Sequence, residues 1–246
     1  MGTLYIVGTP IGNLEDISVR ALDVLARVAL IASENPQRTQ RLLARYDIRT
    51  PMRRYTDAYE RKKESRQRAV LAALETGDVA LVSEAGMPGL ADPGYELIAA
   101  ALEKGIPVEP IPGPTAVAAA LSVAGIDSER FVFLGFLPRG RSARRNLLAS
   151  LVAHPFALVA YESPHRLLDT LADLERLFGH RQVVVAGELT KLYEEMQRGT
   201  ATELLAHYRA HKPRGEFTLA IASPSLPAGE AGGRRKGRPD DDPTGG

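Results

Sequence analysis

The chain has 246 residues, of which 44% are hydrophobic, and its formal net charge is +1 at pH 7. The hydrophobic fraction is enough for a packed globular core, and the small net charge means that any RNA contact must come from a local patch. The chain has no cysteine, which excludes disulfide scaffolds and thiolate metal sites, and no apolar run approaches the roughly 20 residues that span a bilayer. We therefore expect a cytoplasmic protein with no membrane partner.

The first half of the chain alternates apolar runs with helical patterns, which predicts a mostly parallel sheet covered by helices. Ser18 or Asp16 can cap the first helix, and Pro36 suits the first turn of the second. The predicted strands cover residues 4–7, 28–32, 79–82 and 106–109. The predicted helices cover 18–27, 37–46, 61–76, 95–104 and 116–124.

Stiff loops rich in glycine and proline lie beside these strands, at residues 8–13, 83–94 and 110–115. Glycine lets a ligand approach the main chain, and proline reduces the entropy lost when a loop is ordered. Ligands of open α/β sheets bind at the carboxyl ends of the strands. The three loops therefore predict a pocket lined by main-chain atoms that suits a nucleoside-like molecule, although each loop alone also fits an ordinary connection.

The second half of the chain predicts another α/β unit, with strands at 131–137, 156–161, 182–188 and 217–222. A composition change near residue 127 divides the chain into an N-terminal domain over 1–126 and a C-terminal domain over 127–223. Residues 224–246 consist mainly of Gly, Pro, Arg and Asp, which predicts a disordered tail.

Several common sites are absent from the sequence. It contains neither a P-loop nor a Gly-x-Gly-x-x-Gly motif, and its five histidines do not form a metalloprotease pattern. We predict no metal site, and group transfer from a bound cofactor remains.

Several motifs in a specific order resemble one family. They read Thr-Pro-Ile-Gly-Asn-Leu at 9–14, Asp-Ile-Ser-Val-Arg-Ala-Leu at 16–22, the loop at 83–94, Pro-Gly-Pro at 112–114, Tyr-Glu-Ser-Pro-His-Arg-Leu-Leu at 161–168, Glu-Leu-Thr-Lys at 188–191 and Arg-Gly-Glu at 214–216. Over residues 3–223 the chain resembles methyltransferases of the tetrapyrrole methylase fold. Within them it resembles the ribosomal RNA small subunit methyltransferase I family, the 16S rRNA (cytidine-2′-O)-methyltransferases.

This resemblance implies two α/β domains with a cofactor cleft between them, S-adenosylmethionine as methyl donor, and a homodimer. It also implies that the acceptor is the ribose 2′-hydroxyl of a cytidine in 16S rRNA of the small ribosomal subunit. The cofactor-binding residues carried over from the family motifs are Thr9, Pro10, Gly12, Gly86, Met87, Leu90, Pro112, Thr115, Ala116, Tyr161, Glu162, Gly215 and Glu216.

A 2′-hydroxyl is a poor nucleophile, so a base within hydrogen-bond reach would help the transfer. The candidates at loop ends are Glu34, Glu84, Glu162 and Glu188, and each could equally be a cap or half of an ion pair. The candidate RNA-binding residues are Arg139, Arg141, Arg144, Arg145 and Arg166. These arginines could neutralise phosphates, or they could belong to a solvated turn and to local salt bridges.

The chain departs from the family pattern on the expected acceptor side. Residues 33–37 read Ser-Glu-Asn-Pro-Gln where the family usually has Ala-Glu-Asp-Thr-Arg, and residues 83–88 read Ser-Glu-Ala-Gly-Met-Pro where it usually has Ser-Asp-Ala-Gly-Thr-Pro. Two alternatives therefore stay open. One is a methylase of the same fold that acts on a small, tetrapyrrole-like molecule, and the other is a non-catalytic relative that binds ribosomes or nucleotides.

Overall fold

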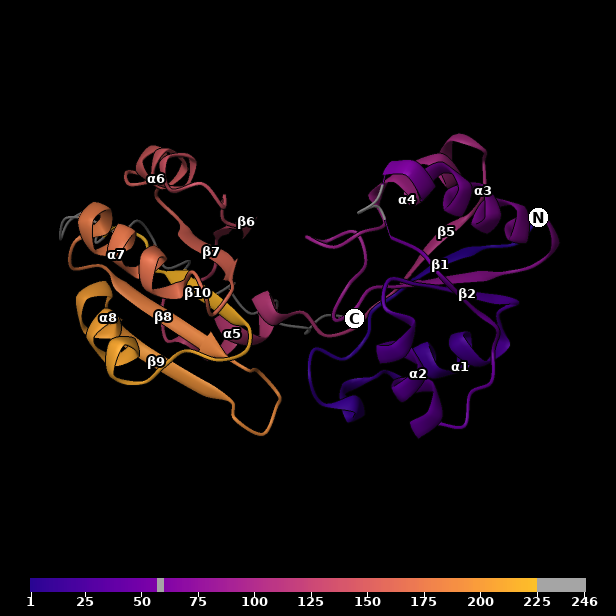
Figure 1. Cartoon of the computed structure of the whole chain (residues 1–246), viewed down its shortest axis with the longest axis horizontal. Coiled ribbons are helices and arrows are strands. Elements are labelled where there is room, and N and C mark those ends of the chain that lie inside the picture. Colours follow the sequence, from indigo (N-terminus) through magenta and orange to yellow (C-terminus); the bar gives the residue numbers. More distant parts are fainter. Residues whose placement is uncertain (57–59, 225–246) are drawn as a thin grey trace, which may run out of the picture.

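The computed structural model describes residues 1–56 and 60–224. They form two lobes, each built on a five-stranded sheet (Figure 1). The predicted disordered tail lies, apart from residue 224, outside the described residues.

The sheet of the first lobe is entirely parallel, with strand order β3-β2-β4-β1-β5. Every residue of β1 and β4 is buried, as expected for strands covered by helices on both faces. The strands are β1 (Leu4–Val7), β2 (Leu30–Ser33), β3 (Met52–Arg54), β4 (Val79–Val82) and β5 (Val108–Ile111).

Helices cover both faces of this sheet (Figure 1). On one face, α1 (Val19–Arg27) and α2 (Pro36–Arg45) bury Leu25 and Leu42 against the strands. On the other face, α3 (Glu60–Thr76) and α4 (Tyr95–Glu103) bury Leu74 and Leu97. A 3-10 turn, η1 (Leu14–Asp16), precedes α1. The carboxyl ends of the parallel strands therefore all meet at one uncovered edge of the sheet, which is where the loops gather.

The sheet of the second lobe is mixed, with order β6-β7-β10-β8-β9, and only the β6–β7 pair is parallel. Its strands are β6 (Phe131–Phe136), β7 (Ala157–Glu162), β8 (Gln182–Gly187), β9 (Glu195–Thr200) and β10 (Phe217–Ile221). The helices α6 (Arg141–Ser150), α7 (Leu167–Phe178) and α8 (Ala201–Ala210) share the larger apolar core of this lobe with the strands.

Helix α5 (Ala116–Ala124) lies on the other face of the second sheet. Its Val117 and Leu121 pack with Val159, Val184 and Ala220 of three strands. The helix thus precedes residue 127 in the chain but joins the second lobe. The division of the chain at residue 127 stays a prediction.

Most predicted elements are present, with ends shifted by a few residues. Ser18 caps α1 by accepting a hydrogen bond from the main-chain N–H of Ala21 at 3.1 Å, whereas Asp16 belongs to the preceding 3-10 turn. Strands β3 and β9 were not predicted. Both are polar edge strands, so neither shows the buried apolar run by which the other strands are recognised.

Candidate active site

The three glycine- and proline-rich loops meet at the carboxyl edge of the first sheet. Thr9 and Gly86 exchange main-chain hydrogen bonds, with N to O distances of 2.9 and 3.0 Å. A Cβ atom added to Gly113 would lie 2.7 Å from the Cα atom of Gly8. The main chains of the loops are therefore in direct contact, and a side chain at Gly113 would force them apart.

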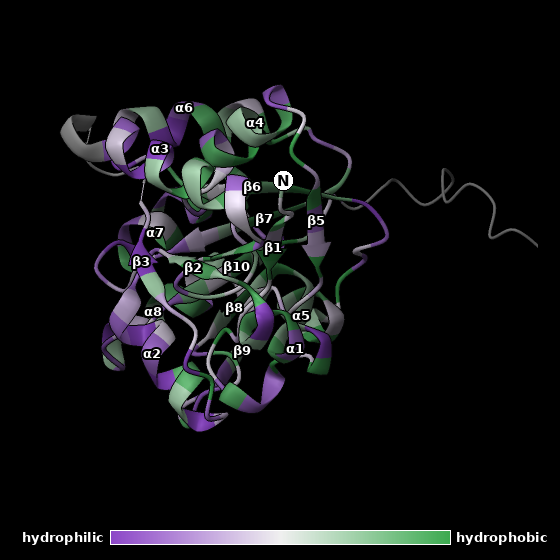
Figure 2. Cartoon of the chain, turned by 90° about the vertical axis from the view of Figure 1, so that its right-hand side faces the viewer, coloured by the Kyte–Doolittle hydropathy of each residue, from purple (hydrophilic) through white to green (hydrophobic). Residues whose placement is uncertain are grey.

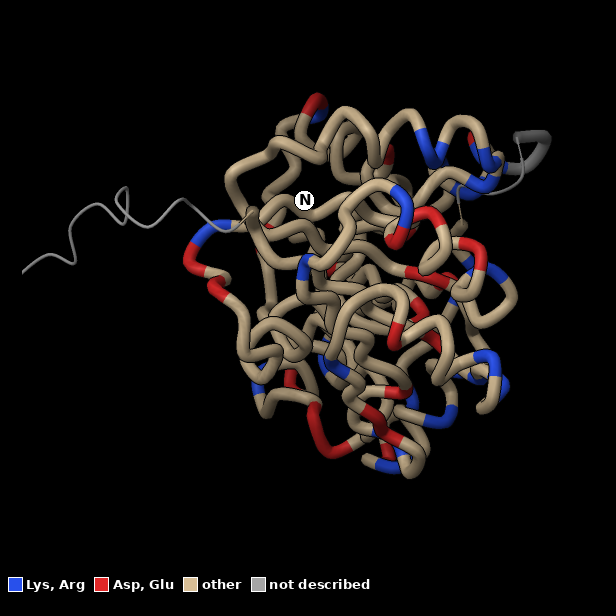
Figure 3. The backbone as a smooth tube through the Cα atoms, turned by 90° about the vertical axis from the view of Figure 1, so that its left-hand side faces the viewer, with Lys and Arg blue, Asp and Glu red and all other residues tan. Residues whose placement is uncertain are grey.

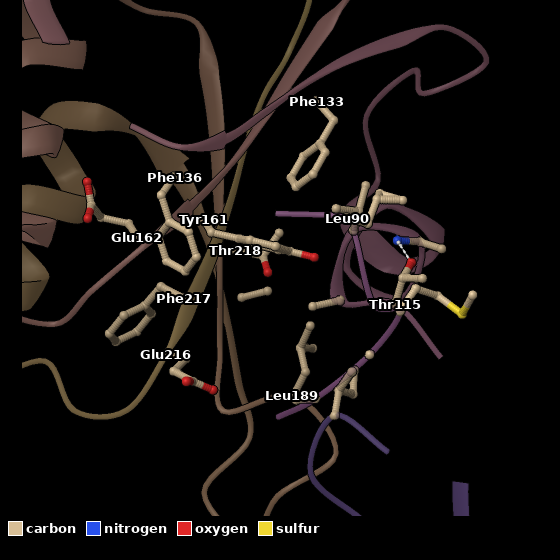
Figure 4. Close-up of a pocket in the computed structure, with 18 of the residues that line it drawn as sticks. Leu90, Thr115, Phe133, Phe136, Tyr161, Glu162, Leu189, Glu216, Phe217 and Thr218 are labelled. Carbon is tan, nitrogen blue, oxygen red and sulfur yellow. Dashed lines mark hydrogen bonds between the residues drawn. The ribbon is translucent and has the colours of Figure 1, made fainter. Parts of the chain in front are cut away.

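A pocket of about 350 Å³ lies between these loops and the second lobe (Figure 4). We call it the interlobe pocket. The first lobe contributes Ile11, Ala85, Gly86, Met87, Leu90 and Asp92 to its lining. The N-terminal turn of α5 contributes Thr115, Ala116, Val117 and Ala118, and the second sheet and its loops contribute Phe131, Phe133, Phe136, Tyr161, Glu162, Ala186, Glu188, Leu189, Lys191, Glu216, Phe217 and Thr218.

Aromatic side chains form the wall of the pocket on the second lobe. The rings of Phe133 and Tyr161 meet edge to face, with centroids 4.9 Å apart, and Phe136 lies 5.4 Å from Tyr161. Such a wall favours a planar, weakly polar group such as a nucleobase. The aromatic wall was missed by the sequence analysis, which chose only Tyr161 from it.

Most of the predicted cofactor-binding residues line this pocket, namely Gly86, Met87, Leu90, Thr115, Ala116, Tyr161, Glu162 and Glu216. Thr9, Pro10, Gly12, Pro112 and Gly215 do not line it. Thr9 instead pairs with Gly86, and Pro112 lines an adjoining hollow. Gly12 packs on Thr190, whose hydroxyl accepts a hydrogen bond from the N–H of Asn13 at 3.0 Å, so this loop joins the two lobes. Gly215 leaves room for the carboxylate of Glu188.

Two of the predicted bases, Glu162 and Glu188, are residues of the pocket lining that are held in ion pairs. Glu162 is buried, accepts a hydrogen bond from Thr170 at 2.7 Å and pairs with Arg166 at 2.6 Å. Figure 4 shows its carboxylate beyond Phe136, turned away from the pocket. Burial alone would raise the pKa of Glu188, but hydrogen bonds from Lys191 and from the N–H of Glu216 outweigh it and hold that pKa below its usual value. Neither carboxylate is well placed to accept a proton.

The other two predicted bases lie outside the pocket lining. The carboxylate of Glu34 accepts a hydrogen bond from the N–H of Glu84 at 3.0 Å, and the side chain of Glu84 pairs with Arg38. The negative charges of Glu34 and Glu84 both help to raise the pKa of a third acid in the first lobe.

That acid is Asp92, which the sequence analysis did not select. It lines the interlobe pocket, and burial raises its pKa to about 6, aided by the negative charges of Glu34 and Glu84 and opposed by a hydrogen bond with Ser83. The preceding residue, Ala91, has a φ of 63°, a strained conformation for a residue with a side chain. Asp92 stands in the loop after β4, where a carboxylate facing a ligand is expected, but the predicted bases were all glutamates.

The predicted RNA-binding arginines fall into two groups. Arg139 and Arg141 are exposed at the start of α6. Arg144 is only 2% exposed and pairs with Asp173 at 2.7 Å, and Arg145 pairs with the same carboxylate at 2.5 Å. Arg166 pairs with Glu162. The prediction of an RNA contact is thus corrected for Arg144, because its guanidinium is enclosed in the second lobe and cannot reach a phosphate.

The described residues contain no group of three or more His, Asp or Glu side chains that could hold a metal ion. Within the same residues, no helix has the length and apolar character needed to cross a membrane.

Comparisons with known proteins agree with the fold. The family model of the tetrapyrrole (corrin/porphyrin) methylases matches residues 3–205. The structure is similar to that of a cobalamin biosynthetic enzyme, cobalt precorrin-4 methyltransferase (TM-score 0.69, 19% identity, 89% of this chain and 94% of that chain). It is also similar to the uroporphyrin-III C-methyltransferase of Thermus thermophilus in complex with S-adenosylhomocysteine (TM-score 0.61, 20% identity, 89% and 97%). The expected fold class is confirmed.

Sequence similarity is closer to another group of proteins. The chain is 45% identical over 223 residues to the ribosomal RNA small subunit methyltransferase I of Thermotoga maritima, covering 90% of this chain and 99% of that protein. The protein of the same name from Synechocystis is 46% identical over 224 residues, covering 90% of this chain and 79% of that one. The chain therefore belongs to the tetrapyrrole methylase family and, within it, to the ribosomal RNA small subunit methyltransferase I family, and it is a methyltransferase.

Proposed function

We propose that this methyltransferase moves the methyl group of S-adenosylmethionine to the ribose 2′-hydroxyl of a cytidine in 16S rRNA of the small ribosomal subunit. The observation that carries the proposal is the interlobe pocket, which combines a main-chain wall, an aromatic wall and one carboxylate of raised pKa. The family name, which specifies small-subunit rRNA, supports the choice of acceptor.

The residues of the pocket fit the donor. The rings of Phe133, Phe136 and Tyr161 suit the adenine, and the main chain at Gly86 can approach a ligand closely because no side chain intervenes. The carboxylates of Asp92 and Glu216 in the same lining favour a positive charge. Bound there, S-adenosylmethionine would supply an activated methyl group on a sulfonium sulfur, so the protein mainly has to align sulfur, methyl carbon and acceptor oxygen.

We assign the role of general base to Asp92 rather than to any of the four glutamates. Its carboxylate accepts the proton of the 2′-hydroxyl while that oxygen bonds to the methyl carbon and the sulfur keeps the electron pair of the broken carbon–sulfur bond. With a pKa of about 6, Asp92 is ionised at neutral pH yet is a stronger base than an ordinary aspartate.

Transfer of a labelled methyl group tests the function. We expect label in the 16S rRNA of unmodified small ribosomal subunits, and none in tetrapyrroles. Label in a tetrapyrrole alone would assign the chain to small-molecule methylation. If calorimetry detects no binding of S-adenosylmethionine at all, the chain would be a non-catalytic binding protein.

The variant Asp92→Asn tests the base. Its carboxamide keeps the shape but cannot take the proton, so we expect kcat to fall about 100- to 10,000-fold, a much larger loss than that of donor affinity by calorimetry, which reflects only the lost negative charge. Unchanged kcat would exclude Asp92 as the base.

The pH dependence of the rate gives a second test of this residue. The wild-type rate should fall as the pH drops through about 6, because a protonated Asp92 cannot accept a proton. Glu34→Gln removes a negative charge that raises the pKa of Asp92, so the acid limb should move to lower pH while the rate at pH 8 is retained. If the acid limb does not move, the pH dependence of the rate does not come from Asp92.

Two finer expectations remain predictions. Since its substrate is the small ribosomal subunit, the enzyme acts in the cytoplasm. A homodimer, implied by the family resemblance, is tested by light scattering at several protein concentrations.

A further inference from the structure

One surface of the first lobe is much more basic than the rest of the chain. Residues 36–56 contain six arginines and a single acidic residue, Asp47, whereas the whole chain has a net charge of +1. The arginines are Arg38, Arg41, Arg45, Arg49, Arg53 and Arg54. This segment covers α2, the following loop and β3.

Two of these arginines belong to the edge strand β3, and they lie on opposite faces of the sheet. Met52 packs into the core beneath α1 and α2, and Tyr55 packs into the core beneath α3 and α4. Because side chains alternate along a strand, Arg54 lies on the side of α2 and Arg53 on the side of α3, and both are exposed. Figure 2 shows β3 between these two helices on one flank of the molecule, and Figure 3 shows that this flank, at the right, carries basic segments with acidic ones among them.

Half of these arginines have carboxylate partners on the surface. Arg38 pairs with Glu84, Arg45 with Glu15 and Arg49 with Asp47. For Arg41, Arg53 and Arg54, all exposed, no carboxylate of residues 1–56 or 63–224 lies within 4.0 Å. We call these three the edge arginines. Within those two ranges, no ion pair offsets their positive charge.

Arg54, the last residue of β3, lies at the same end of the first sheet as the interlobe pocket. Arg54 lies opposite Ser33 in the register of β3 and β2, and the next residue, Tyr55, donates its N–H to the carbonyl of Ser33 at 2.8 Å. The carboxyl ends of these parallel strands face the loops that line the pocket. Arg38 of α2 also pairs with Glu84, in the loop that continues to Gly86 and Asp92.

We propose that the edge arginines Arg41, Arg53 and Arg54 bind the phosphodiester backbone of the RNA that flanks the methylated nucleotide. This inference rests on the proposed function. A pocket of about 350 Å³ takes the reacting groups only, so the rest of the RNA runs over the surface beside it. Arginine holds phosphate through two parallel N–H donors, and such contacts set the register of the nucleic acid. The surface lies on the lobe opposite Arg139 and Arg141, so the RNA has contacts on both sides of the pocket.

The test reverses the charges and keeps the surface polar. In Arg53→Glu/Arg54→Glu and in the triple variant with Arg41→Glu, we measure binding to transcribed 16S rRNA over a salt series and the KM for small ribosomal subunits. Loss of three contacts should lower the slope of log K against log salt by about 2, since each contact to a single strand contributes about 0.7. The KM should rise at least about tenfold, with kcat and donor affinity retained.

A matched control reverses two exposed arginines on the outer helices of the second lobe, Arg176→Glu/Arg209→Glu. This variant should keep the wild-type KM and salt slope. If the edge variants behave like this control, the proposed surface is wrong although the methylation of rRNA stands. If wild-type protein transfers no methyl group to rRNA, the proposed function itself fails. Loss of binding to vesicles of anionic lipid, with RNA binding intact, would overturn the inference in favour of a membrane surface.

Discussion

The two walls of the interlobe pocket are built in different ways. The wall from the first lobe consists of loops whose main chains touch, at Thr9 and Gly86 and at Gly8 and Gly113. The wall from the second lobe consists of aromatic side chains that contact one another across β6 and β7. The main-chain wall has no room for an added Cβ atom at Gly8 or Gly113, whereas the side-chain wall depends on which residues it holds.

The second lobe also depends on side-chain contacts in its interior, where buried carboxylates pair with arginines. Asp173 holds both Arg144 and Arg145, and Glu162 holds Arg166. Burial alone would raise the pKa of Asp173, but the hydrogen bonds from the two arginines outweigh it and lower that pKa. The interior of the second lobe therefore depends on ion pairs between buried side chains. Removing one member of such a pair should lower the free energy of unfolding more than a change in a loop does.

The largest expected effect comes from breaking the buried ion pair. Asp173→Ala leaves Arg144 buried without its carboxylate, so the free energy of unfolding should fall by about 3–5 kcal/mol. Urea denaturation measures it, with Asp169→Ala as control because Asp169 is an exposed residue of the same helix. Equal stability of the two variants would show that the pair is dispensable.

Arg144→Met should alter stability while leaving the salt dependence of RNA binding unchanged.

The next effect comes from the main-chain wall. Gly113→Ala places a methyl group 2.7 Å from Gly8, and the overpacking should cost about 1–3 kcal/mol, or about 10- to 100-fold in donor affinity by calorimetry. Gly140→Ala serves as control, because a Cβ there has no atom within 4 Å. Wild-type affinity in Gly113→Ala would mean that the loop contact does not shape the donor site.

The smallest effect comes from a single ring of the aromatic wall. Phe133→Leu keeps the site apolar but removes the edge-to-face contact with Tyr161, worth about 1 kcal/mol, so donor affinity should fall about fivefold. The control is Phe156→Leu, whose ring contacts His154 outside the pocket. A loss of a hundredfold or more in Phe133→Leu would reverse the comparison and make the aromatic wall the main binding surface.

The same contrast explains what the sequence could predict. Strand β4 and helix α5 have the predicted bounds, because a buried apolar run and a small-residue helix ended by glycine are local signals. The loops of the main-chain wall were predicted from glycine and proline for the same reason. Strands β3 and β9 lack such a signal because they are polar and lie at sheet edges.

The side-chain wall and the charges depend on contacts between distant segments. A shift in strand register between Phe133 and Phe136, with Gly135 at a φ of 61°, brings Phe136 next to Tyr161. The pKa of Asp92 depends on Glu34, Glu84 and Glu216, which come from three separate loops. The burial of Arg144 depends on Asp173, 29 residues away. No local pattern carries this information.

The exposed strand β3 has a consequence for the behaviour of the protein in concentrated solution. As the outermost strand, it leaves one row of N–H and C=O groups available to a strand from another molecule. Arg53 and Arg54 place two like charges on this row, so two copies of the strand repel each other. Isoleucine at both positions would turn this edge into a site of intermolecular sheet growth, and the protein would aggregate.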